Sequence, residues 1–256
     1  MRHARTHVVI TGGGQGVGLA IATQMVAEGC RSLALVGRDP AKLEAAAATF
    51  PSGVRVACLA GDVSRVSECE RLFHGALRDL GDVNVLVNAA ATSARGTLVD
   101  TDEETFDALF STNVKGPFFM SQQLVRHALE VGRPAAIVNI LSMAAHGGAA
   151  NLSPYAASKG ALATLTRNIA GAYRANRVRC NAILPGWMDT PGEDAVQKKW
   201  HGAGDDWLAI AEAAQPMGQL VKPHQLAFLA SYMASPDAGV MTGALVDYDQ
   251  TIIGVV

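Results

Sequence analysis

A tyrosine and a lysine four residues apart, Tyr155 and Lys159, are the pair in this sequence best suited to acid/base chemistry. On a helix they are i and i+4 neighbours, so phenol and ammonium project from one face, with Cβ atoms roughly 5–6 Å apart. A tyrosine acting as a base near neutrality needs its pKa of about 10 lowered by roughly 3 units, or about 4 kcal/mol. An ammonium about 5 Å away supplies on the order of 3 kcal/mol. A second positive charge, such as an oxidised nicotinamide ring, would supply the remainder.

The same spacing also arises by chance in surface helices, so the elements around it decide its meaning. Near the N-terminus, the β-branched run 8–10 predicts a buried strand, and residues 19–26 predict a helix. The glycine-rich segment Thr11–Gly18 lies between them. A strand, a glycine turn and a helix N-terminus form a phosphate-binding arrangement, because the turn lets the backbone approach a pyrophosphate and the helix N–H groups face its charge.

These landmarks resemble those of the short-chain dehydrogenases/reductases, in order and in spacing. The resemblance covers essentially the whole chain and rests on Thr11-Gly12-xxx-Gly16-x-Gly18, Asn88-Ala89-Ala90, Asn113, Ser142, Tyr155, Lys159 and Pro185-Gly186. It implies a single Rossmann-like domain over residues 1–256, with a cofactor half of about 1–135 and a catalytic and substrate half of about 136–256. It also implies an NAD(P)-dependent oxidoreductase that interconverts a secondary alcohol and a ketone.

Strand-like and helix-like segments alternate along the chain. The expected strands after the first are 32–36, 54–59, 83–87, 136–140, 178–183 and 243–247, and helices are expected at 40–49 and 66–80. Continuous apolar strands separated by amphipathic helices predict an α/β fold, a doubly wound parallel sheet with helices on both faces. In such sheets ligands bind beyond the carboxyl ends of the strands, where the strand order reverses.

The resemblance assigns roles to individual residues. The implied catalytic residues are Asn113, Ser142, Tyr155 and Lys159: Ser142 donates a hydrogen bond to the substrate oxygen, Tyr155 exchanges the hydroxyl proton, Lys159 lowers the pKa of the tyrosine and binds the nicotinamide ribose, and Asn113 helps hold a water beside the lysine. Asn113 could instead serve only a tertiary contact. Besides Tyr155 and Lys159, the implied cofactor contacts are Gly12, Gly14, Gln15, Gly16, Val17, Gly18, Arg38, Asp62, Val63, Asn88, Ala89, Pro185, Gly186, Met188 and Thr190.

The choice of cofactor depends on the end of the second strand. An acid there would bind the adenosine ribose hydroxyls and repel a 2′-phosphate, whereas an arginine would pair with that phosphate. Gly37 occupies the position where the family usually places the acid, and Arg38 follows it. We expect Asp39 to be the N-cap of a helix that opens with Pro40. These residues favour NADP(H), with NAD(H) as the alternative.

Substrate contacts are expected from two segments. The implied substrate-binding residues are Ser142, Tyr155, His146, Asn151 and Trp187, and glycine-interrupted residues 187–215 are expected to form a lid. Tryptophan combined with polar groups in these segments favours a sugar or polyol as the substrate. The alternatives are a 3-oxoacyl or other ketone reductase, a non-redox dehydratase or epimerase, and, in last place, a cofactor-sensing binding protein.

Composition narrows the classes of partner. The 256 residues carry a formal net charge of −2, which gives no reason to expect a nucleic acid or an anionic membrane as partner. The four cysteines show no CxxC spacing, so we expect reduced thiols, no metal and a cytoplasmic protein. No segment reaches the roughly 18 apolar residues of a membrane span. The resemblance implies a homotetramer or homodimer, with a small-molecule alcohol or ketone as substrate.

Overall fold

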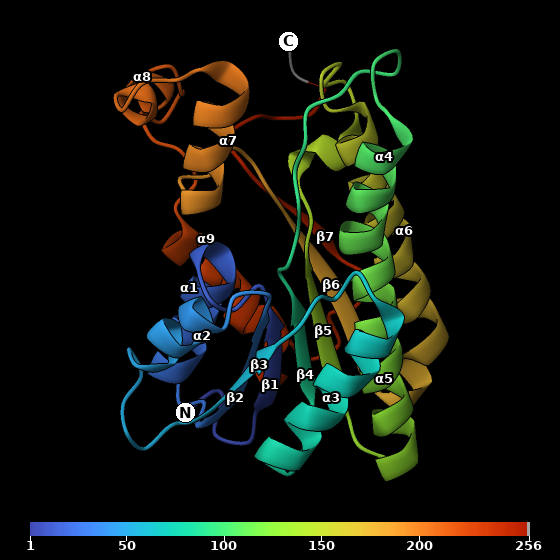
Figure 1. Cartoon of the computed structure of the whole chain (residues 1–256). Helices are drawn as coiled ribbons and strands as arrows, with labels where there is room; N and C mark the ends of the chain where they lie inside the picture. Colours follow the sequence, from blue (N-terminus) through green and yellow to red (C-terminus); the bar gives the residue numbers. More distant parts are fainter. Residues whose placement is uncertain (255–256) are drawn as a thin grey trace.

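The computed structural model describes residues 1–254, which form a parallel sheet of seven strands covered by helices on both faces (Figure 1). The order of the strands is β3-β2-β1-β4-β5-β6-β7. The strands are β1 (His7–Thr11), β2 (Ser32–Gly37), β3 (Arg55–Ala60), β4 (Val85–Asn88), β5 (Ala135–Ile140), β6 (Val178–Pro185) and β7 (Leu245–Tyr248). The chain runs outward from β1 to β3 and then returns to β4 on the other side of β1, so the strand order reverses between β1 and β4.

The sequence-based prediction of a doubly wound parallel sheet is therefore confirmed, and each predicted strand is present with its ends moved by at most a few residues. The register explains why the strands read as continuous apolar runs. Val9 lies opposite Ala34 of β2 and Leu86 of β4, so β1 is hydrogen-bonded on both edges and packed on both faces.

Helices divide between the two faces of the sheet. They are α1 (Gly16–Ala27), α2 (Pro40–Ala47), α3 (Val66–Leu80), α4 (Glu103–Phe110), α5 (Gly116–Val131), α6 (Ser153–Tyr173), α7 (Pro191–His201), α8 (Trp207–Ala213) and α9 (Pro223–Ala234). Helices α1, α2 and α9 pack on one face around Val8 and Ile10. Helices α3, α5 and α6 pack on the other face around Val9, because successive side chains of a strand point to opposite faces.

Two segments contain helical structure that the sequence analysis did not specify. Asn113 was expected in a continuous helix, but α4 passes into a π-helical turn, η1 (Ser111–Lys115), before α5 begins. π-Helical turns inside α-helices are frequent at functional sites. Residues 187–215 were expected to be a glycine-interrupted lid, and they contain α7 and α8, which lie above the sheet in Figure 1.

Smaller features agree with the sequence-based expectation. The Asp39 side chain accepts from the backbone N–H groups of Ala41 and Lys42 and so caps α2, which has Pro40 in its first turn. The four cysteines are free thiols. Among the helices of residues 1–254, none has the length and apolar character needed to cross a membrane.

Candidate active site

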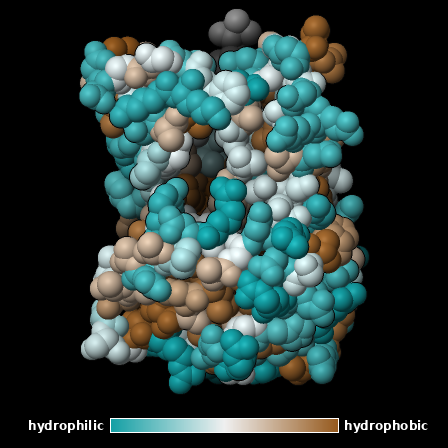
Figure 2. All heavy atoms as spheres, viewed as in Figure 1, coloured by the Kyte–Doolittle hydropathy of each residue, from teal (hydrophilic) through white to brown (hydrophobic). Residues whose placement is uncertain are grey.

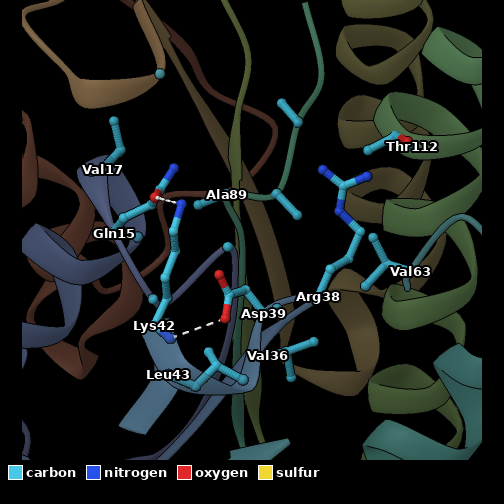
Figure 3. Close-up of a pocket in the computed structure, with 18 of the residues that line it drawn as sticks. Gln15, Val17, Val36, Arg38, Asp39, Lys42, Leu43, Val63, Ala89 and Thr112 are labelled. Carbon is cyan, nitrogen blue, oxygen red and sulfur yellow. Dashed lines mark hydrogen bonds between the residues drawn. The ribbon is translucent and has the colours of Figure 1, made fainter. Parts of the chain in front are cut away.

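A cavity of about 350 Å³ lies at the carboxyl ends of the strands, beside the point where the strand order reverses. Figure 2 shows this face of the molecule hollowed near its centre, and Figure 3 shows side chains of the cavity wall. The lining residues are Gly12, Gly14, Gln15, Gly16, Val17, Gly18, Val36, Gly37, Arg38, Asp39, Lys42, Leu43, Gly61, Asp62, Val63, Ala89, Ala90, Ala91, Thr92, Thr112, Thr190 and Gly192. Most of the cofactor contacts expected from the sequence are thus brought together in one wall.

The turn between β1 and α1 needs glycine at defined positions. Gly12 and Gly16 have φ angles of +69° and +55°, which side-chain-bearing residues rarely adopt. A Cβ on Gly12 would lie 3.0 Å from the carbonyl oxygen of Ala89, and a Cβ on Gly18 would collide with the backbone of Gly12. The first turn of α1 is therefore left with bare backbone facing the cavity, and these residues fit the pyrophosphate of a dinucleotide.

The far end of the cavity is lined by cationic side chains. Arg38, from the end of β2, projects toward the cavity in Figure 3, and Lys42, from the first turn of α2, donates a 2.8 Å hydrogen bond to the Oε1 atom of Gln15. The carboxylate of Asp39 lies at the same end, but one of its oxygens accepts the two backbone N–H groups that begin α2.

Lys42 was not anticipated from the sequence. The available signal was a lysine in the first turn of a helix, where the macrodipole disfavours a cation and gives no structural reason for one. The expected adenine contacts Asp62 and Val63 do line the cavity, and the Asp62 carboxylate also accepts from the Ser64 N–H at 2.9 Å.

Six of the expected cofactor residues do not line this cavity: Asn88, Tyr155, Lys159, Pro185, Gly186 and Met188. Asn88 is buried and donates 2.8 Å and 3.3 Å hydrogen bonds to Asn139 and Ser121, so its amide joins β4 to β5 and α5. Its Oδ1 atom has no hydrogen-bond partner among the described residues. Gly186 receives support from the C-terminal tail, since its N–H donates to the carbonyl oxygen of Tyr248 at 3.0 Å.

Tyr155 and Lys159 share one face of α6 beside the end of β5. The Lys159 ammonium, only 2% exposed, donates to the Ile140 carbonyl oxygen at 3.0 Å and lies 5.7 Å from the centroid of the Tyr155 ring. Burial lowers the pKa of Lys159 to about 8. Burial also raises the pKa of the half-buried Tyr155 to about 12, and its hydrogen bond with Ser142 opposes this rise. Without a further positive charge, the tyrosine is therefore a neutral phenol at physiological pH.

Ser142 stands where β5 gives way to a short 3-10 helix (Met143–His146). Its Oγ atom accepts from the Ala144 N–H at 3.2 Å, which fixes the side chain at the start of that turn. The hydroxyl can still reach the phenol of Tyr155. A serine and a tyrosine hydroxyl thus face a common position, one from the sheet and one from α6.

Asn113 joins the cavity wall to α6. Its amide oxygen accepts from the Thr92 N–H at 2.9 Å, and its amide nitrogen donates to the Thr92 carbonyl oxygen at 3.0 Å and the Ser158 hydroxyl at 3.1 Å. The tertiary-contact interpretation, which the sequence left open, thus has direct geometric support. Because Ser158 directly precedes Lys159, Asn113 also positions the helix segment that carries the ammonium.

The expected substrate contacts are more widely spread. The His146 Nε2 atom lies 2.8 Å from a carboxylate oxygen of Asp247 on β7, so that ring atom is already engaged within the protein. Asn151 is exposed, and its carbonyl oxygen accepts from the Gly96 N–H at 3.0 Å. Trp187 is partly exposed, and its indole N–H donates to Glu193 of α7 at 2.8 Å.

Two residues beside the phenol were missed by sequence reasoning: Arg95, in the loop after β4, and Glu193, in the first turn of α7. Glu193 raises and Arg95 lowers the pKa of Tyr155 through their charges, after the larger effects of burial and Ser142. The closest approach between their side chains is 3.9 Å. Neither lies in a recognisable motif, so no sequence signal pointed to them.

Comparisons with known proteins agree with this geometry. A family model described as short chain dehydrogenase matches residues 6–200. The chain is 32% identical to 2-(S)-hydroxypropyl-CoM dehydrogenase 3 of Xanthobacter autotrophicus, covering 93% of this chain and 92% of that protein. It is also 32% identical to a sorbitol dehydrogenase of Cereibacter sphaeroides, covering 94% of each. Among solved structures, a 3-ketoacyl-(acyl-carrier-protein) reductase of Brucella melitensis in complex with NADH superposes with a TM-score of 0.84, at 28% identity over 95% of this chain and 96% of that chain.

Proposed function

Because the chain belongs to the short-chain dehydrogenase family and is an NAD(P)-dependent oxidoreductase that interconverts secondary alcohols and ketones, we propose that Tyr155 is its acid/base residue. The observation that supports this most is the arrangement of Tyr155, Ser142 and Lys159 beside a glycine-lined cavity. When bound, the nicotinamide dinucleotide supplies the hydride acceptor or donor at its ring.

In the direction of oxidation, the chain's own residues handle the proton and the developing charge. The Ser142 hydroxyl donates to the substrate oxygen and holds it against the phenol. Tyr155 takes the hydroxyl proton as the carbonyl forms, which requires its pKa to fall from about 12. The buried Lys159 ammonium contributes to that fall, and an oxidised nicotinamide carries the second positive charge. Reduction reverses each proton transfer.

For the cofactor we propose a preference for NADP(H) over NAD(H). Support comes from Arg38 and Lys42, two cations that line the cavity at the end of β2. A 2′-phosphate carries charge that such side chains stabilise, and Lys42 is already held toward the cavity by Gln15. The lining contains two acids, Asp39 and Asp62, and the commitment of Asp39 to the N-terminus of α2 weakens its ability to bind ribose hydroxyls.

For the substrate we propose a neutral hydroxylated molecule of the sugar or polyol class. Trp187 and Trp207 lie close together, with ring centroids 6.2 Å apart, and both belong to the region around α7 and α8. Trp207 is buried, whereas Trp187 is 39% exposed, so Trp187 offers the open apolar face against which the C–H groups of a sugar can pack. The sorbitol dehydrogenase at 32% identity supports the same class. A 3-oxoacyl or other ketone reductase is the second candidate, supported by the similarity to the Brucella melitensis reductase.

The test is a spectrophotometric screen at the nicotinamide absorbance. Polyols, aldoses and simple ketones are each offered with NAD(H) and with NADP(H), and 3-oxoacyl thioesters are included for the second candidate. We expect turnover with at least one polyol and higher kcat/KM with NADP(H). Absence of any absorbance change with every alcohol and ketone would instead support a dehydratase or epimerase.

We also propose that the chain acts in the cytoplasm as a homodimer or homotetramer, built from the outer faces of α4, α5 and α6. Phe106 of α4 and Phe118 of α5 support this, since they are 43% and 44% exposed. Light scattering after size-exclusion chromatography gives the molar mass directly. We expect two or four times the mass of one chain, and a monomer would contradict the assembly.

A further inference from the structure

Arg95 and Glu193 form a pair of opposite charges across the mouth of the active site, on two segments that are distant in sequence. The backbone next to Arg95 is pinned to the approach to α6, because Gly96 N–H donates to the Asn151 carbonyl oxygen and the Gly96 carbonyl oxygen accepts from the Ser153 N–H, both at 3.0 Å. Glu193 follows Gly192, which lines the cavity, in the first turn of α7. Both side chains are therefore carried by fixed backbone near Tyr155.

Hydrogen bonds fix both side chains, but each keeps at least one polar atom that makes no hydrogen bond with a described residue. The guanidinium of Arg95 donates from Nε to His201 at 3.2 Å and from one terminal nitrogen to Ser93 at 3.3 Å. Its other terminal nitrogen lies 3.9 Å from Glu193, beyond hydrogen-bond distance, and donates to no described residue at shorter range. The N–H groups of this terminal nitrogen are thus available to donate to a ligand.

Glu193 has the complementary arrangement. Its Oε1 atom accepts from the indole N–H of Trp187 at 2.8 Å and from the amide of Gln197 at 2.7 Å. Its Oε2 atom accepts no hydrogen bond from residues 1–254. The two side chains are 17% and 19% exposed, so part of each is open to solvent. Arg95 thus keeps a terminal nitrogen as an available donor, and Glu193 keeps Oε2 as an available acceptor while its Oε1 atom holds the indole of Trp187.

The charges also restrict the ligand. The opposite charges of Arg95 and Glu193 cancel. The Nε2 atom of His201 accepts the hydrogen bond from Arg95, so that nitrogen carries no proton. An anionic substrate would gain from Arg95 and lose to Glu193, whereas a hydroxyl group can accept from the guanidinium and donate to the carboxylate. Gly96, next to Arg95, accepts from Ser153 at the start of α6, and Gly192, next to Glu193, lines the cavity, so both charges lie near the Tyr155 end of α6.

We propose that Arg95 and Glu193 are specificity residues that bind hydroxyl groups neighbouring the reacting carbinol of a neutral polyol. This inference rests on the proposed function and narrows it, since it assigns the extra hydroxyls to two named side chains. A site built around a substrate hydroxyl discriminates strongly against the analogue that lacks it, because its buried polar groups are then left unpaired.

The test compares sorbitol and galactitol with hexan-2-ol, which has the same chain length and one hydroxyl, using Arg95→Met and Glu193→Ala. Lys198→Met is the matched control, because it removes an ion pair with Asp194 on the same helix without touching the cavity lining. For each hexitol that the wild type accepts, we expect both variants to lose about 10- to 100-fold in kcat/KM, mainly through KM. Hexan-2-ol should change by less than about threefold, as should all substrates with the control.

Other results overturn the assignment. Equal losses with hexan-2-ol and the hexitols would mean that the pair only fastens α7 to the loop after β4. A wild type that prefers 3-hydroxybutyrate, with the larger loss in Arg95→Met, would make Arg95 an anion site. Calorimetric titration of the hexitols in the presence of oxidised dinucleotide requires no turnover, so absence of binding there overturns the inference even if the reaction class were different. Binding that both variants weaken, without any nicotinamide reduction, would leave the pair assigned and reject the oxidoreductase reaction with these polyols.

Discussion

The ammonium of Lys159 donates a 3.0 Å hydrogen bond to the carbonyl oxygen of Ile140, the last residue of β5. This bond ties the catalytic face of α6 to the strand that leads into Ser142. It is also a cation inside the protein with no carboxylate acting on its pKa, so burial alone lowers that pKa to about 8. Burial of the Lys159 ammonium at the acid/base site therefore lowers the stability of the folded protein.

That cost predicts a pH dependence of the free energy of unfolding. Between the folded pKa of about 8 and the ordinary lysine pKa of 10.5, the unfolded chain holds the Lys159 proton more tightly, so this residue's contribution makes stability rise with pH in this window. The full effect is about 3 kcal/mol. Lys159→Met has no titrating group at this position, so its stability lacks this contribution. The free energy of unfolding of the wild type minus that of the variant should therefore increase by about 3 kcal/mol from pH 8 to 10.5. Urea unfolding at several pH values measures the difference, and a constant difference would contradict the prediction.

Tyr155→Phe should separate binding from chemistry. Phenylalanine keeps the ring on α6 and removes the hydroxyl that exchanges the proton, so turnover should fall by at least about 10²-fold. Dinucleotide affinity, measured by calorimetry, should stay within a few-fold. Tyr173→Phe at the end of the same helix is the matched control and should leave both quantities unchanged. Normal turnover in Tyr155→Phe would remove the role assigned to Tyr155.

Arg38→Ala and Lys42→Ala should each weaken NADP(H) more than NAD(H). Both side chains line the cavity at the end of β2, and a charge-assisted hydrogen bond to phosphate contributes about 1.5–3 kcal/mol before solvent screening reduces it. We expect roughly tenfold weaker binding of 2′,5′-ADP and little change for 5′-ADP. Arg65→Ala, a nearby exposed cation outside the lining, is the control. Equal weakening of both nucleotides would remove the preference for NADP(H).

Much of the fold follows from local sequence pattern. The predicted bounds of α3 agree with the structure, because its apolar residues repeat at helical spacing and Gly81 ends it in a left-handed conformation. Strand ends carry the expected cofactor residues for a general reason, since ligand sites of parallel sheets lie at their carboxyl edge. The sequence order of strand, glycine turn and helix was therefore enough to predict the wall that contains Gly12 and Asp62.

The remainder depends on contacts between distant segments. Nothing local to His146 shows that Asp247 of β7 will engage its ring, and nothing local to Arg95 shows that α7 will bring Glu193 beside it. Lys42 becomes a cavity residue only because α2 turns its first turn toward Gln15. Such pairings are set by tertiary packing, which a motif does not encode.

The N-terminus contains a histidine that is held in one protonation state. His3 is completely buried, with Nδ1 3.0 Å from the Thr6 hydroxyl and Nε2 2.8 Å from the Ser231 hydroxyl. Ser231 donates its own hydrogen to Glu28 at 2.7 Å, so it accepts from His3, and Nε2 must carry the ring proton. Nδ1 is then left to accept from Thr6, which makes the neutral ring the form that satisfies every partner.

This arrangement predicts a loss of stability in mild acid. Burial lowers the pKa of His3 below the ordinary histidine value of 6.5; Glu28 and Asp237 oppose that change, and Arg2 reinforces it. Below pH 6.5 the unfolded chain therefore binds a proton that the folded chain resists, and stability falls as pH decreases. We expect the melting temperature of the wild type to drop from pH 7.5 to 5.5 by more than that of His3→Asn, which cannot titrate. Glu28→Gln, which removes the carboxylate but keeps an acceptor for Ser231, should steepen the drop, because the main group favouring the protonated ring is gone. Parallel profiles for wild type and His3→Asn would show that other groups set the acid limit.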